Sequence, residues 1–340
     1  MNLSQRLRWI WKGETPEAQR VRRALKLSVL VALFVGLFWI IPIQDVVHAL
    51  LTADPLFLVL GLLLGVPSVY FNAMQMKILV QKQGIVISAG EIMHINLAVK
   101  FYTLFMPSTM VAGGIRWYQF SRKNGKFAEA LAAMAFFRVI ELYLTVVLGL
   151  AFWFLSGQDS VQMNIAWLVA IVVGTTLLWI AVTRASKPFS NWFELSFRPK
   201  ISSPRWQPLL KQLERFFQAV VTYADFTVWD LFWVIFIGIV QQLIGILSNV
   251  LLAKSVGIDL TYTQMGWVYS VVILASQLPF AFAGGLGIRE VTLIALLSTF
   301  GIGADLALAF SLLLFVRGIF LSLVGGLLEV LQAMRLKRTA

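Results

Sequence analysis

The chain of 340 residues is 59% hydrophobic and only 13% charged. Its mean hydropathy of +0.82 excludes a water-soluble globular protein, because so few polar side chains cannot cover the surface of a fold of this size. The absence of cysteine excludes disulfides and thiolate chemistry, and the wide separation of the two histidines, His48 and His94, argues against a metal cluster or a metal cofactor.

Apolar runs of about 20 residues, the length that a helix needs to cross a bilayer, recur along the chain, whereas the alternating strands of a barrel do not. The sequence therefore predicts an all-α, polytopic integral membrane protein. The first run follows a basic segment and is interpreted as a retained signal anchor, because no small-residue cleavage site follows it. About six spanning helices are predicted, at residues 27–43, 55–76, 127–155, 164–183, 228–252 and 304–332.

The net charge of +12 is unevenly distributed along the chain. The predicted loops 44–54 and 156–163 hold no lysine or arginine. By the positive-inside rule, the basic segments and both termini are predicted on the cytoplasmic side of the cytoplasmic (inner) membrane. The charge then requires no nucleic acid, and anionic lipid headgroups are the expected partners. Of the 28 lysines and arginines, 23 lie in segments 1–26, 77–90, 113–126, 184–215 and 333–340.

Two further apolar stretches, 91–112 and 262–300, are interrupted by proline and glycine. If 91–112 crossed the membrane, the basic residues of 113–126 would lie outside, so this stretch is predicted to dip in from the cytoplasm and to return there. Its break is "MPSTMVAGGIR", in which the proline and the glycine pair permit a reversal of the chain. The second stretch, with the break "LPFAFAGGLGIRE", is predicted to dip in from the outside.

The two breaks share one order of residues: a proline, a short apolar spacer, Ala-Gly-Gly and an arginine. Each precedes a long apolar helix with one arginine near its middle, Arg138 in the first half and Arg317 in the second. Two re-entrant helical hairpins in an inverted repeat are typical of transporters, although a single break of this kind also occurs at a kink or a close helix crossing. The matching residues are Pro107, Ala112, Gly113, Gly114 and Arg116, and Pro279, Ala283, Gly284, Gly285 and Arg289.

These patterns divide the chain into five parts. Two membrane halves are separated by a basic cytoplasmic loop that includes an amphipathic helix, and a basic cytoplasmic tail lies at each end. The predicted bounds are 1–26 for the first tail, 27–183 for the first half with its hairpin at 91–112, 184–225 for the loop, 226–332 for the second half with its hairpin at 262–300, and 333–340 for the last tail.

Charged residues inside the apolar segments are candidate functional residues, because each is costly there. Arg138 and Glu141 are three residues apart on one helix face and form either a structural ion pair or part of a substrate site. No acidic residue lies within a turn of Arg317, and a lone arginine at a helix centre costs about 2.5–3.5 kcal/mol. Either Glu290 or Glu141 from another helix neutralises it, or the phosphate of a ligand does.

Several other polar residues also lie in apolar surroundings. Asn96 and Lys100, one turn apart, share a helix face, and Lys100 either neutralises an anionic headgroup or extends to the interface. Arg289 and Glu290 form either a capping salt bridge or a gate. The residues predicted to hydrogen-bond between helices are Gln241, Gln242 and Asn249.

The paired breaks and the helices that follow them resemble the lysylphosphatidylglycerol synthase transmembrane-region family. The resemblance runs from about Leu56 to Leu331 and includes Asn96, the first Gly-Gly, Arg116 and Arg138, with the pattern Pro-x4-Gly-Gly-x-Gly-x-Arg-Glu in the second half. It implies a stand-alone, flippase-like member. The aminoacyl-transferase activity of fused relatives is not expected, since no soluble synthase domain follows.

The predicted function is translocation of an anionic phospholipid or a polyprenyl-linked lipid through a central cavity lined by arginines, without enzymatic activity and either alone or with a lipid-synthesis enzyme as partner. The first alternative is a membrane-embedded lipid-modifying transferase or an accessory protein, and the second is an ion or small-solute transporter. The predicted substrate-binding residues are Arg138, Arg317, Lys100, Asn96 and Glu141, and the predicted hinge and gate residues are Pro107, Gly113, Gly114, Arg116, Pro279, Gly284, Gly285, Gly287, Arg289 and Glu290.

Overall fold

The computed structural model describes residues 51–105, 109–122, 125–157, 207–277 and 288–338, together with His48 and Gly174. Residues 49–340 form one compact unit, which holds all the helices named below. Several predicted features lie outside the described residues, namely the tail 1–26, the spans 27–43 and 164–183, the loop residues 184–206, and the hinge residues Pro107, Pro279, Gly284, Gly285 and Gly287.

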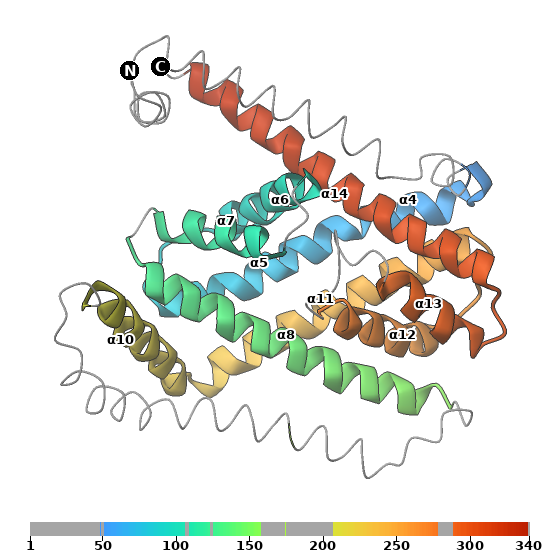
Figure 1. The fold of residues 1–340 in the computed structure, drawn as a ribbon, viewed down its shortest axis with the longest axis horizontal. Helices are drawn as coiled ribbons and strands as arrows, with labels where there is room; N and C mark the ends of the chain where they lie inside the picture. Colours follow the sequence, from blue (N-terminus) through green and yellow to red (C-terminus); the bar gives the residue numbers. More distant parts are fainter. Residues whose placement is uncertain are drawn as a thin grey trace. The chain divides into compact units, whose positions relative to one another are not determined.

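Every regular element among the described residues is a helix (Figure 1). Four of the predicted spans are confirmed by length and composition: Pro55–Lys82, which joins α4 to α5, and the long helices α8, α11 and α14. The last helix continues to Arg338, through most of the predicted tail 333–340. The bounds are α4 Pro55–Leu63, α5 Gly65–Lys82, α6 Ala89–Phe105, α7 Thr109–Arg122, α8 Phe127–Leu155, α10 Gln207–Thr222, the 3₁₀ turn η1 Tyr223–Asp225, α11 Val228–Ser255, α12 Tyr262–Ala275, α13 Ile288–Ser298 and α14 Ala304–Arg338.

The predicted span 55–76 is confirmed, but it consists of two helices that meet at Leu64, and it continues to Lys82. The break has a local cause: Pro67 has no N–H to donate to the carbonyl of Leu63, where α4 ends. The start is as expected for a capped helix, since the side chain of Asp54 accepts hydrogen bonds from two backbone N–H groups of the first turn.

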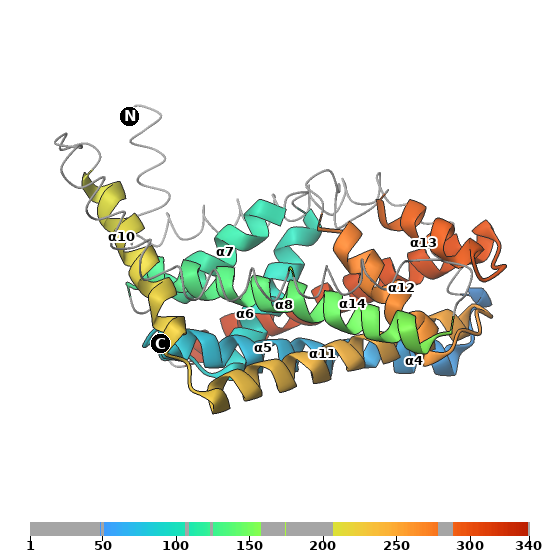
Figure 2. The same ribbon diagram turned by 90° about the horizontal axis from the view of Figure 1, so that it is seen from below.

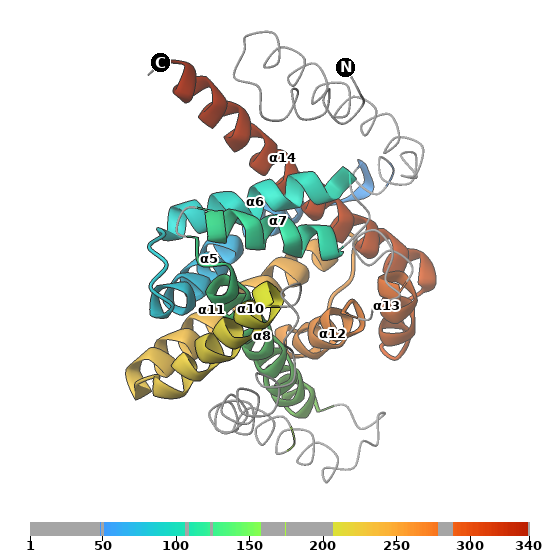
Figure 3. The same cartoon turned by 60° about the vertical axis from the view of Figure 1, so that its left-hand side comes forward.

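Each interrupted stretch forms a pair of short helices, α6 with α7 and α12 with α13, which lie side by side (Figures 1 and 3). The longest of the four, α6, has 17 residues. At 1.5 Å per residue it extends about 26 Å, less than the hydrocarbon core of about 30 Å. The prediction that Gly113 and Gly114 reverse the chain is wrong in position, because both lie inside α7. The first helix has already ended at Phe105.

The long helices α5 and α11 run side by side in opposite directions (Figures 1 and 2). At one end, Lys82 Nζ lies 2.7 Å from the carboxylate of Asp230, which joins the end of α5 to the beginning of α11. At the other end, the N–H of Asp54, just before α4, donates to the carbonyl of Ser255 at 2.7 Å. The span formed by α4 and α5 is therefore fixed in register with α11 at both ends.

Two of the helix interfaces between the halves of the chain involve the short helices: α6 packs on α14, and α12 packs on α8. Glycines permit both close approaches. A Cβ at Gly325 of α14 would clash with the carbonyl of Leu97 in α6, and a Cβ at Gly149 of α8 would lie 2.6 Å from Cβ of Ser270 in α12. Small residues at helix contacts strengthen van der Waals packing where lipid provides no hydrophobic driving force.

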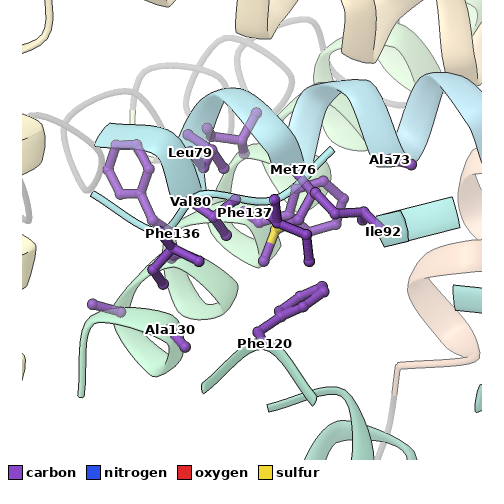
Figure 4. Close-up of a cluster of buried hydrophobic side chains, with 14 of the residues drawn as sticks. Ala73, Met76, Leu79, Val80, Ile92, Phe120, Ala130, Phe136 and Phe137 are labelled. Atoms are coloured by element: carbon purple, nitrogen blue, oxygen red, sulfur yellow. The ribbon is translucent and has the colours of Figure 1, made fainter. Parts of the chain in front are cut away.

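A cluster of buried apolar side chains from α5, α6, α7 and α8 fills the bundle near the beginning of α8 (Figure 4). The C-terminal part of α10 packs against this cluster through Phe216, Ala219 and Val220. Next to α10, the ring of Tyr223 stacks on Phe136 with centroids 4.2 Å apart. Burial raises the pKa of the Tyr223 phenol well above its usual value, so the hydroxyl remains protonated and donates to a backbone carbonyl of α5.

Candidate functional site

A cavity of about 480 Å³ lies among α5, α6, α7, α8, α11, α12, α13 and α14. Its volume is in the range of small-molecule sites, about 300–1,000 Å³. All five predicted substrate-binding residues line this cavity: Asn96, Lys100, Arg138, Glu141 and Arg317. Two predicted gate residues, Arg116 and Arg289, also line it, and a third, Glu290, is hydrogen-bonded to Arg289.

A chain of polar contacts crosses one side of the cavity. Asn96 donates to the side-chain oxygen of Asn72 at 3.2 Å, and Asn72 donates to Glu141 at 2.9 Å. The other oxygen of Glu141 lies 3.4 Å from Arg138, which also donates to the side chain of Gln277. The chain links α6, α5, α8 and the end of α12, so Glu141 and Arg138 neutralise each other within a fixed network.

Arg289 and Glu290 form a second network on α13. Arg289 donates to Glu290 at 2.8 Å and to the hydroxyl of Ser311 at 3.1 Å, while that hydroxyl donates to Glu290 at 2.7 Å. This triangle joins α13 to α14. The pair is one-tenth to one-fifth exposed, which places it inside the bundle rather than at a solvated surface.

Arg317 has a neutral partner. It donates to the hydroxyl of Ser248 at 3.0 Å, and Ser248 donates to the carbonyl of Gly61. No ion pair joins Arg317 to a carboxylate within the described ranges, so the two carboxylates that the sequence offered, Glu141 and Glu290, pair with other arginines instead. The sequence left open which of them neutralises Arg317, and in the described structure neither does.

Lys100 and Arg116 have no ion pair either, as far as the described residues extend. The Nε atom of Arg116 is buried and has no hydrogen-bond partner. Lys100 is exposed in the described structure, whereas Arg116 and Arg317 are half-buried, and all three line the cavity. We call Lys100, Arg116 and Arg317 the unpaired cations; they come from α6, α7 and α14.

The structure also shows which polar residues sequence reasoning missed. Asn72 and Ser248 connect the arginine networks to neighbouring helices, and both line the cavity. An asparagine inside a predicted span was a usable signal for Asn72, whereas serine is common in membrane helices and gave no signal for Ser248. Of the three residues predicted to hydrogen-bond between helices, Gln242 is confirmed, since its side chain donates to the hydroxyl of Thr145 in α8 at 3.0 Å. Asn249 instead donates to the carbonyl of Gly245 in its own helix.

The cavity, the four apolar spans and the paired short helices can be compared with known proteins. The profile of the family described as "Lysylphosphatidylglycerol synthase TM region" matches residues 24–326, which is most of the chain. The chain belongs to this family. No curated protein and no solved structure gives a significant match.

This chain belongs to the lysylphosphatidylglycerol synthase TM region family and has four apolar spans, so it is a multi-pass membrane protein. The matched range extends over both arginine networks and all three unpaired cations. Among the described residues, no group of three or more His, Asp or Glu side chains is placed to hold a metal ion. The guanidinium and ammonium groups that line the described cavity can bind an anion.

Proposed function

We propose that this protein translocates lipids with an anionic headgroup across the membrane. The headgroup would cross through the cavity while its apolar chains remain in the surrounding lipid. One observation carries the proposal: Lys100, Arg116 and Arg317 converge on a single cavity, and none of them has an ion pair within the described ranges. Unpaired cations inside a membrane bundle are costly, and an anionic ligand offsets that cost.

An inverted repeat is part of the proposal, and the packing supports it. In the first half, α6 is the first short helix and α8 the following span; in the second half, α12 and α14 occupy the same places in chain order. The first short helix of each half packs on the span that follows the pair of short helices in the other half, α6 on α14 and α12 on α8. Such reciprocal contacts are expected of two halves related by a two-fold axis.

Re-entry of the short helices from opposite faces is also proposed. Lys126 Nζ, just before α8, donates to the carbonyls of Gln83 and Gly84 at 3.0 and 3.1 Å, so the chain enters and leaves the first helix pair at adjacent points. In the second pair, the ring of Trp267 in α12 lies 5.8 Å from Phe300, just after α13. Under the positive-inside rule the first pair would open toward the cytoplasm and the second toward the outside.

The two arginine–carboxylate networks suit gates better than catalysis. The contact of Arg138 with Gln277 ties α8 to the end of α12, and the triangle of Arg289, Glu290 and Ser311 ties α13 to α14. Glu141, the carboxylate among the lining residues, is already bonded to Arg138 and Asn72 and is poorly placed to act as a general base. A separate lipid-synthesis enzyme would then provide the substrate.

The proposal is tested with the purified chain in liposomes that carry a trace of phosphatidylglycerol with a fluorescent acyl chain. Dithionite added outside bleaches the outer leaflet, and only translocation exposes the inner half of the label. We expect the parent protein to expose nearly all of the label and Arg317→Gln to slow this exposure at least about tenfold, a barrier increase of about 1.4 kcal/mol. Lys254→Gln is the matched control, because Lys254 pairs with Asp259 and does not line the cavity.

A soluble fluorescent sugar trapped in the same liposomes separates lipid transport from anion transport. If the protein let dithionite itself through, the trapped sugar would be bleached together with the lipid, and a small-anion transporter would be the better assignment. Exposure of the label no faster than in protein-free liposomes, or at the same rate in the parent and Arg317→Gln, would contradict the proposal.

A further inference from the structure

We infer that the cavity selects headgroups that end in a phosphate monoester or a diphosphate, with two or more negative charges, over phosphodiester headgroups with one. The inference rests on the proposed function and concerns its substrate class. It is carried by the charge balance, the free hydrogen-bond donors and the position of the three unpaired cations.

The charge balance favours a ligand with more than one negative charge. Of the five basic side chains that line the cavity, Arg138 and Arg289 are each neutralised by a carboxylate. Lys100, Arg116 and Arg317 remain. A phosphodiester would neutralise one of these three charges and leave two without a counter-charge, whereas a dianionic phosphate leaves one.

The free donors match the oxygens of a terminal phosphate. Nε of Arg116 is buried without a partner, and Arg317 uses Nη1 alone in its bond to Ser248. The ammonium group of Lys100 makes no hydrogen bond to a described side chain or backbone group. A terminal phosphate presents three strong acceptor oxygens, and a phosphodiester presents two that are not bridging.

The three cations line a single cavity. Lys100 is on α6, which packs against both α7 and α14, the helices that carry Arg116 and Arg317. A phosphate bound in this cavity beside Lys100 would therefore lie among side chains from both halves of the chain, and its charge would offset theirs.

The inference is tested by binding of short-chain lipids to the purified chain in a neutral detergent, measured by calorimetry. Dioctanoylphosphatidic acid has a terminal phosphate, and dioctanoylphosphatidylglycerol has the same chains on a phosphodiester. At about pH 8 the first carries nearly two negative charges and the second one. We expect the phosphatidic acid to bind the parent chain at least about tenfold more tightly.

Arg116→Gln and Lys100→Gln are expected to weaken phosphatidic acid about tenfold and to reduce the preference, whereas Lys254→Gln keeps both. The melting temperature of each variant without ligand shows whether it is folded. If one of the two cavity variants is misfolded, the test rests on the other. Equal affinity of the parent for the two lipids, or an unchanged preference in both cavity variants, would overturn the inference.

Glycerol 3-phosphate, which has the terminal phosphate without acyl chains, distinguishes a lipid ligand from a soluble one. Weaker binding than the phosphatidic acid supports a lipid substrate, and equal binding overturns it in favour of a soluble phosphate ester. The liposome assay is independent of these affinities. Translocation without a phosphate preference removes only this inference, and a phosphate preference without translocation removes the proposed function.

Discussion

At the scale of single residues, the cavity contains two kinds of arginine. Arg138 and Arg289 belong to networks that satisfy them, while Arg116 and Arg317 retain unneutralised charge. Both side chains are half-buried. Because a cation without a counter-charge inside a membrane bundle destabilises the empty protein, its presence is better explained by ligand binding than by folding. A substitution that removes one of these charges should therefore stabilise the empty protein and weaken ligand binding.

Lys100→Met is expected to leave the melting temperature of the empty protein unchanged or to raise it, because the substitution removes a cation that has no ion pair among the described residues, at similar side-chain volume. The same variant should lose most of the stabilisation that phosphatidic acid gives the parent. Both values come from thermal unfolding in detergent with and without ligand. A lower melting temperature with full ligand stabilisation would show that Lys100 has a structural role.

Glu141→Gln provides the opposite case. It removes the counter-charge of Arg138 while keeping an oxygen that can accept from Asn72. Because the side chain of Arg138 is half exposed, we expect a moderate loss of stability, about 1–3 kcal/mol. Denaturant or thermal unfolding beside the parent measures this loss. Stability equal to that of the parent would mean that Glu141 and Arg138 do not depend on each other.

Gln277→Glu tests the first of the two proposed gates. It places a carboxylate where Arg138 now donates to a neutral amide, which strengthens the link between α8 and the end of α12. We expect slower lipid exposure in the dithionite assay, by several-fold, together with unchanged or higher thermal stability. Gln277→Ala, which removes the link, is the control and should not be slower than the parent. Faster exposure by Gln277→Glu would argue against a gate here.

At the scale of elements, the crossing of short helices over spans depends on glycine. Gly325 and Gly326 of α14 lie against Leu97 and Phe101 of α6, and Gly149 and Gly266 form the contact between α8 and α12. Both interfaces thus use the same device, as expected if the two halves are equivalent.

Gly325→Ala is expected to destabilise the chain by about 1–3 kcal/mol, because its Cβ would collide with the backbone of α6, which cannot shift like a flexible side chain. Gly318→Ala, two turns earlier in α14, is the matched control. A Cβ there meets nothing within 4 Å, so better helix propensity should stabilise by up to about 1 kcal/mol. Thermal unfolding of both variants beside the parent measures the difference, and equal effects would show that the α6–α14 contact is not close.

At the scale of the whole molecule, the arrangement in the membrane is tested by single cysteines, since the natural chain has none. Ser88→Cys, before α6, is expected to react with a membrane-impermeant maleimide only from the cytoplasmic side, and Thr261→Cys, before α12, only from outside. Both positions are exposed, whereas Ser121 is fully buried and would give no information. Labelling of both cysteines from one side would remove the inverted arrangement.

Much of this architecture could be predicted from the order of residues. Local hydropathy predicts the membrane class, four described spans and the two interrupted stretches. The reason is that the bilayer thickness fixes the length of apolar helix that can cross it, whatever the fold. The break at Leu64 was missed although its cause, Pro67, is in the sequence, since proline in the first turn of a helix more often begins a helix than divides a span.

The sequence by itself determined that this is a helical membrane protein and that a few basic residues are confined to apolar segments. Only the tertiary structure decided which of them share a cavity and which are neutralised. Glu141 pairs with Arg138 and Glu290 with Arg289, and Arg317 is left to Ser248. The physical reason is that hydropathy depends only on consecutive residues, which the sequence shows directly. Charge pairing depends on distances of a few ångströms between helices that are far apart in the chain, which only the tertiary structure determines.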